Sequence, residues 1–192
     1  MEPKEVAFCN MEWRIGNFVA VRLQGLFKEV DGMADFFAEF RGDHRWVMQT
    51  LLEVQRALEQ RQWERALELV EALDRATGPH MEFEEKHLYP EFVPLVGQER
   101  VQEMLNDHGG AAQILQRVKG RLRQGALSDE EVAALKGDLQ RFLRHAADCE
   151  GSALLAEALP PERIEELGRL LVSLRATGRP LTVYRGVAAA QD

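Results

Sequence analysis

The sequence predicts an all-α fold: an up-down-up-down antiparallel four-helix bundle with an N-terminal extension and a short C-terminal helix. Strand signals are nearly absent, because alternating runs of Val, Ile and Thr do not occur while good helix formers (Leu, Ala, Glu, Arg and Gln) dominate. Apolar residues recur with the helical period of 3.6 in four long segments. The connections between the segments are short, so consecutive helices should lie antiparallel.

The four long segments run from about residue 31 to 59, 63 to 92, 98 to 124 and 128 to 155. Asp31 can cap the first segment, and Ser128 with Glu131 forms a capping-box pattern at the start of the fourth. A shorter helix should start at Pro160-Pro161 and end near residue 173. The predicted domain organisation is an N-terminal extension over 1–30 that packs on the bundle, the bundle with its fifth helix over 31–175, and a loosely ordered tail over 176–192.

Prolines should interrupt the second segment. Gly78-Pro79 predicts a kink or a brief break just before His80, since proline removes a backbone donor and clashes with the preceding turn. Pro90 and Pro94 should then end this helix.

Bulk composition excludes several classes of function. The net charge of -8 argues against a nucleic-acid partner. No apolar run approaches the ~18 residues of a membrane span. The N-terminus lacks the layout of a signal peptide, and two cysteines, Cys9 and Cys149, form no disulfide framework. We therefore expect a cytoplasmic protein with no membrane or nucleic-acid partner.

All five histidines fall on the predicted apolar stripes: His44, His80, His87, His108 and His145. A buried polar group without a partner is costly, so this many on apolar faces need a common partner. A metal ion is the simplest one, and inward imidazoles with nearby carboxylates suit iron or a similar transition metal.

The spacing within two segments brings possible ligands to one helix face. His80 and Glu84 are four residues apart, about 40° around a helix, and His145 and Cys149 have the same relation. Glu150 is five residues from His145, about 140° around, so it reaches the same point only if the helix widens near residues 147–149.

The histidines should also share one level of the bundle. Measured from the turn near residue 61, His44 lies about 25 Å and His80 about 28 Å along the helices, at ~1.5 Å per residue. Measured from the turn near residue 126, His108 and His145 both lie about 27 Å along. The sequence therefore predicts one shared site.

The pattern of possible ligands resembles that of the hemerythrin-like, or HHE cation-binding, domain. It consists of one His on the first helix, His-x3-Glu on the second, one His on the third, and His plus a carboxylate on the fourth. The stretch from Glu84 to Pro90 is similar to the end of that family's second helix, and the resemblance covers roughly residues 31–158. It implies two non-haem irons bridged by carboxylates and an oxo or hydroxo group. Members of the family bind oxygen or nitric oxide, sense redox state, or handle iron.

Carried over to this chain, the resemblance implies the ligands His44, His80, Glu84, His108 and His145, with Glu84 bridging the metals.

The chain departs from the family pattern at two places. Ala112 stands where invertebrate hemerythrins carry a further third-helix His, and His87 could supply that missing ligand. Cys149 stands where bacterial members often carry Glu. We expect Glu150 to be the fourth-helix ligand and Cys149 to lie beside the site as a packed or redox-responsive thiol, with direct ligation by Cys149 as the alternative.

Neighbouring polar residues are expected outside the site. Asp43 and Asp107 should be solvated, and Glu85 should point away from the metals. Tyr89 could line the pocket, with core packing as the default.

The predicted function is binding or sensing of oxygen or nitric oxide, or a response to redox or iron state, rather than catalysis. The alternatives are a ferritin-like di-iron oxidase or peroxidase, an iron-handling protein and a metal-free helical adaptor. A His-rich site with few carboxylates favours binding over oxygen activation. The sequence identifies no protein partner.

Overall fold

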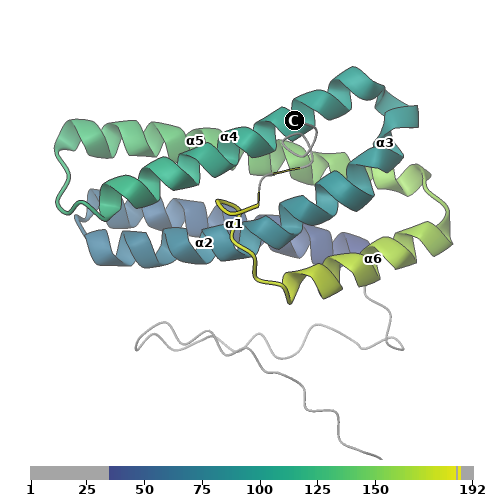
Figure 1. Cartoon of the computed structure of the whole chain (residues 1–192), viewed down its shortest axis with the longest axis horizontal. Helices are drawn as coiled ribbons and strands as arrows, with labels where there is room; N and C mark the ends of the chain where they lie inside the picture. Colours follow the sequence, from purple (N-terminus) through teal and green to yellow (C-terminus); the bar gives the residue numbers. More distant parts are fainter. Residues whose placement is uncertain (1–34, 185, 187–192) are drawn as a thin grey trace, which may run out of the picture. The chain divides into compact units, whose positions relative to one another are not determined.

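The computed structural model describes residues 35–184 and 186, and all regular structure within them is helical, which confirms the predicted all-α fold (Figure 1). The long helices are α1 (Phe36–Glu59), α2 (Trp63–Phe83), α4 (Gln98–Leu122) and α5 (Asp129–Ser152). The shorter elements are the π-helix η1 (Glu84–Leu88), α3 (Tyr89–Val96), the 3-10 helix η2 (Ala153–Ala158) and α6 (Pro161–Arg175). The predicted extension over 1–30, and Asp31, lie outside the described residues. Within the described ranges, no helix is both long and apolar enough to cross a bilayer.

Side-chain caps set the start of two long helices. The Asp35 carboxylate accepts a hydrogen bond from the backbone N–H of Ala38 at 3.2 Å, so α1 begins at Phe36, later than predicted. Ser128 and Glu131 form the predicted capping box at the start of α5. Local sequence chemistry thus accounts for both starts.

The prolines interrupt the second helical run less than predicted. Pro79 lies inside α2, so the break expected as one possibility before His80 does not occur. Pro90 occupies the first turn of α3, where its missing N–H costs little, and the run continues past Pro94. It ends at Gly97, whose φ of 85° lies in a region that favours glycine.

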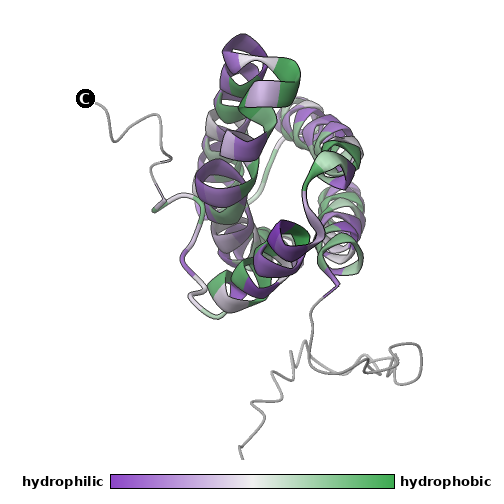
Figure 2. Cartoon of the chain, turned by 90° about the vertical axis from the view of Figure 1, so that its right-hand side faces the viewer, coloured by the Kyte–Doolittle hydropathy of each residue, from purple (hydrophilic) through white to green (hydrophobic). Residues whose placement is uncertain are grey.

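The four long helices enclose the core. α1 packs against α2 and α5, α4 packs against the same two helices, and α6 packs on α1 and α2. Each helix carries both hydrophobic and hydrophilic residues, as expected for helices that bury one face (Figure 2). The buried apolar residues form two clusters, and His44 and His108 each fall, along their own helices, where one cluster gives way to the other. A polar site therefore separates two apolar regions.

The π-helix η1 changes which residues face the core. A π-turn holds an extra residue, so it alters the rotation of the side chains in it relative to an α-helix. Glu84 and Glu85 are both buried, which shows that the expectation of an outward Glu85 is wrong. The helix widening expected near residues 147–149 does not occur, because α5 stays α-helical through Ser152. The widening lies in η1 instead.

The segment after α6 lies against α2 over residues 179–184, although a loosely held tail was expected. The Leu181 backbone N–H donates to the Asp74 carbonyl at 2.8 Å, and its side chain is buried. The Thr182 hydroxyl donates to the Asp74 carboxylate at 2.7 Å. Two residues further on, the Tyr184 hydroxyl donates to Glu85 at 3.0 Å. These bonds tie the segment to the helical run that carries Glu84 and Glu85.

Gly78→Ala should destabilise the protein by about 1–3 kcal/mol, because overpacking displaces backbone. A Cβ at Gly78 would lie 1.9 Å from the Arg179 carbonyl oxygen, so residues 179–181 would have to move. Thermal unfolding and limited chymotryptic proteolysis after Tyr184 measure the effect. Gly120→Ala is the matched control: it lies in α4 with open space at its Cβ, so it should gain up to ~1 kcal/mol. Equal stability of the two variants would contradict the proposed packing.

Candidate metal centre

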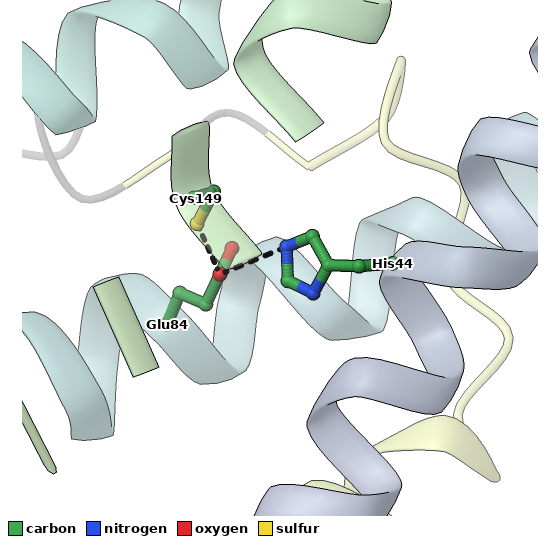
Figure 3. A group of neighbouring side chains, drawn as sticks. All are labelled: His44, Glu84 and Cys149. Carbon is green, nitrogen blue, oxygen red and sulfur yellow. Dashed lines mark hydrogen bonds and ion pairs between the residues drawn. The ribbon is translucent and has the colours of Figure 1, made fainter. Parts of the chain in front are cut away.

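The Glu84 carboxylate lies at the centre of a buried cluster of donor atoms. Its Oε1 is 2.8 Å from Cys149 Sγ, 3.3 Å from His80 Nε2 and 3.8 Å from His44 Nε2. Its Oε2 is 3.2 Å from His108 Nε2. Figure 3 shows the Cys149 thiol and the His44 ring directed toward Glu84 from two other helices. The two oxygens of one carboxylate therefore face different sets of donors.

An aspartate orients the ring of His80. Asp43 Oδ2 accepts a hydrogen bond from His80 Nδ1 at 2.9 Å, which leaves Nε2 directed toward Glu84. Arg175 of α6 holds the same carboxylate, with Nη2 2.8 Å from Asp43 Oδ1. The expectation that Asp43 is solvated is therefore wrong. A carboxylate behind a histidine is the usual support of a metal-binding imidazole.

The Nδ1 atoms of His108 and His44, which face away from Glu84, are also held by hydrogen bonds. His108 Nδ1 donates to Glu85 Oε1 at 2.9 Å, and Tyr184 donates to the other oxygen of Glu85. His44 Nδ1 donates to the Phe40 carbonyl at 3.0 Å, one turn back along α1. Each ring is thus fixed with its Nε2 toward the interior.

His145 lies beside the cluster, with its ring centroid 5.1 Å from that of His108. The His44 and His80 rings are 4.6 Å apart, and Glu84 lies within 4 Å of both and of His108, so these four histidines lie at one level of the bundle, as predicted. Asp107 is exposed, as expected, with an oxygen 4.0 Å from His145 Nδ1.

On α5 the structure brings Cys149, rather than Glu150, to Glu84. Cys149 is 4% exposed, and its thiol also lies 3.3 Å from the Tyr89 hydroxyl. Glu150 is half-buried and lies about 100° further around the regular helix, on a neighbouring face. His87 is half-buried and lies among the charges of Lys86, Arg163 and nearby acidic groups rather than among the donor atoms.

The sequence-based prediction missed Asp43 and Glu85, and it gave core packing as the default role of Tyr89. The Tyr89 hydroxyl lies 2.9 Å from His108 Nε2, and the residue is 1% exposed. Its position five residues after Glu84 would have suggested a shared face only if the π-turn between them had been foreseen.

Charges inside the cluster hold protons on two of the histidines. Burial opposes the charged form of His80, but the Glu84 carboxylate and the hydrogen bond to Asp43 outweigh it and raise its pKa to about 10. For His108, burial is outweighed by bonds to Glu84 and Glu85, which raise the pKa to about 9. Burial opposes ionisation of Glu84, but these two cations hold its pKa well below the usual range. Protons thus supply positive charge where a metal ion could supply it instead.

The remaining donors are neutral in the metal-free protein. Burial, reinforced by the charge of His80, lowers the pKa of His44 to about 4. Burial and the charge of His108 likewise lower the pKa of His145 to about 4. Burial and the adjacent Glu84 carboxylate raise the pKa of the Cys149 thiol well above its usual range.

The residues present fit a metal ion. His80 Nε2 is buried and makes no hydrogen bond of acceptable geometry within the described part of the chain. Donor atoms of His44, Glu84 and Cys149 lie within 4.8 Å of one another, close enough to share an ion. Imidazole nitrogen with carboxylate oxygen is a donor set that suits iron, and a thiol broadens the choice toward softer metals.

Comparison with known families identifies this region. The family model described as hemerythrin HHE cation binding domain matches residues 35–158, which include α1 through η2. Comparisons with curated proteins and with solved structures gave no match.

Proposed function

Because the chain belongs to the hemerythrin HHE cation-binding domain family, we propose that it is a non-haem di-iron protein that binds or senses oxygen or nitric oxide, or responds to redox state. The long helices would run up-down-up-down around the metals. The proposed ligands are His44, His80, Glu84, His108 and His145, with Cys149 as a further fourth-helix donor on the side of Glu84 that faces His44. Glu150 is not among the proposed ligands, because the widened helix that it would need to contact the metal is absent from α5.

The observation that carries the proposal is the position of Glu84. Its Oε1 faces His44 and His80, while its Oε2 faces His108, which lies next to His145. A carboxylate between two pairs of imidazoles can hold one metal ion with each oxygen. This arrangement supports a dinuclear site with Glu84 as the bridge.

A cavity gives small ligands access to one side of the site. It has a volume of about 260 Å³, and Tyr89, His145 and Cys149 line it together with residues of α3, α4 and α5. Such a space accommodates a diatomic molecule. As an iron-bound thiolate, Cys149 would be oxidised readily beside an oxygen-carrying iron. Its position therefore favours sensing of nitric oxide or redox state over oxygen storage.

Iron analysis tests the proposal. Protein expressed in iron-supplied medium should contain about two irons per chain, as expected when one carboxylate bridges two ions. Mössbauer spectroscopy should show a coupled pair, and the reduced protein should form a stable nitrosyl complex. Rapid turnover of oxygen would indicate the oxidase alternative. A chain that takes up no metal would refute the proposed function, and a single zinc would reduce the site to a structural one.

A further inference from the structure

The hydroxyl of Tyr89 lies among the donor atoms themselves. It is 2.9 Å from His108 Nε2 and 3.3 Å from Cys149 Sγ, and that thiol is 2.8 Å from Glu84 Oε1. Nε2 is the nitrogen that His108 directs inward, since Nδ1 is bound to Glu85. The phenol oxygen therefore touches the atoms that would bind the metals, not the residues behind them.

Core packing does not explain this hydroxyl. The ring of Tyr89 packs near Phe92, with centroids 6.3 Å apart, and phenylalanine would serve equally well there. A buried hydroxyl needs a polar partner. Once the Nε2 lone pair of His108 is bound to a metal, that nitrogen can neither donate to nor accept from the phenol. Loading of the site thus removes one partner of Tyr89 and places a cation close to its oxygen.

We propose that Tyr89 is itself a metal ligand on the His108 side of the site, an inference that rests on the proposed iron centre. Its O–H bond breaks, the proton leaves to solvent through the adjoining cavity, and the oxygen bonds to the metal with no change of oxidation state. Ala112, one turn after His108 on α4, carries no donor atom, so α4 supplies no second ligand at that position. An anionic oxygen donor in place of a neutral imidazole stabilises ferric iron, so this half of the site should favour the oxidised state.

The test uses the fact that the chain contains two tyrosines, of which Tyr184 is the other. The oxidised, iron-loaded wild type should show a phenolate-to-iron charge-transfer band, with tyrosinate ring vibrations in resonance Raman spectra excited within it. Tyr184→Phe leaves Tyr89 as the single tyrosine and should keep both signals. Tyr89→Phe should lose both, and its iron content should fall from about two to about one per chain.

The outcomes separate this inference from the proposed function. Wild type with two irons but without tyrosinate vibrations overturns the role of Tyr89 and leaves the di-iron centre standing. Loss of the vibrations in Tyr184→Phe while about two irons per chain are retained overturns it as well, because Tyr184 would then be the source. A wild-type protein that binds no iron overturns both the role of Tyr89 and the proposed di-iron function. The Tyr184→Phe measurement keeps the inference testable even where Tyr89→Phe fails to fold.

Discussion

Glu84→Gln should lose at least one of the two irons. The amide keeps the shape of the side chain but removes its charge and leaves one oxygen, so it cannot bridge two cations. The change also removes the negative charge nearest His80 and His108, whose Nε2 atoms lie 3.3 and 3.2 Å from the carboxylate. Loss of groups that merely support a metal ligand already costs about 10–100-fold in metal affinity, so loss of the bridging group should cost more.

Iron per chain after desalting, together with the visible spectrum, measures this effect. Asp74→Asn is the matched control, because Asp74 is a comparably buried carboxylate of α2 bound to Lys119 and Thr182 rather than to the donor cluster. It should lower stability while keeping two irons. Full iron content in Glu84→Gln would contradict the central role of Glu84, and equal loss in both variants would attribute the effect to stability alone.

Removal of the metal should lower the melting temperature by roughly 5–15 °C without unfolding the bundle. A ligand at 100 to 1,000 times its Kd adds about 3–4 kcal/mol, and each kcal/mol shifts the melting temperature of a chain this size by about 2–4 °C. The apolar clusters on either side of the site remain in the metal-free protein. In addition, His80 and His108 can take up protons that partly replace the lost positive charge.

Thermal unfolding followed by far-UV circular dichroism, before and after chelation, measures this difference. The chelated protein should keep its helical spectrum at 25 °C, and re-addition of ferrous iron under anaerobic conditions should restore the melting temperature. Glu84→Gln should respond much less to the chelator. An unchanged melting temperature in the wild type would show that the histidines are not bound to metal.

The regular rotation of side chains around an α-helix explains which parts of the site could be predicted from the sequence. The α-helical period brings His80 and Glu84 to one face and places Cys149 one turn after His145. It also predicts that Glu85 points outward, which fails because η1 is a π-helix. Asp43 was expected in solvent for a related reason: its partners, His80 and Arg175, come from other helices, 37 and 132 residues further along the chain.

The sequence by itself determined the helical class, most helix bounds, the family and the common level of four histidines. These depend on the apolar period, the helix caps, the rise per residue and the spacing of the His and Glu residues, all of which can be read along the chain. The tertiary structure decided which atoms meet: Cys149 rather than Glu150 beside Glu84, Glu85 behind His108, and the Tyr89 hydroxyl among the donors. It also placed residues 179–184 against α2. The physical reason is that these contacts join residues far apart in the sequence. They also depend on the π-turn of η1, which rotates Glu85 and Tyr89, and on the absence of such a turn from α5.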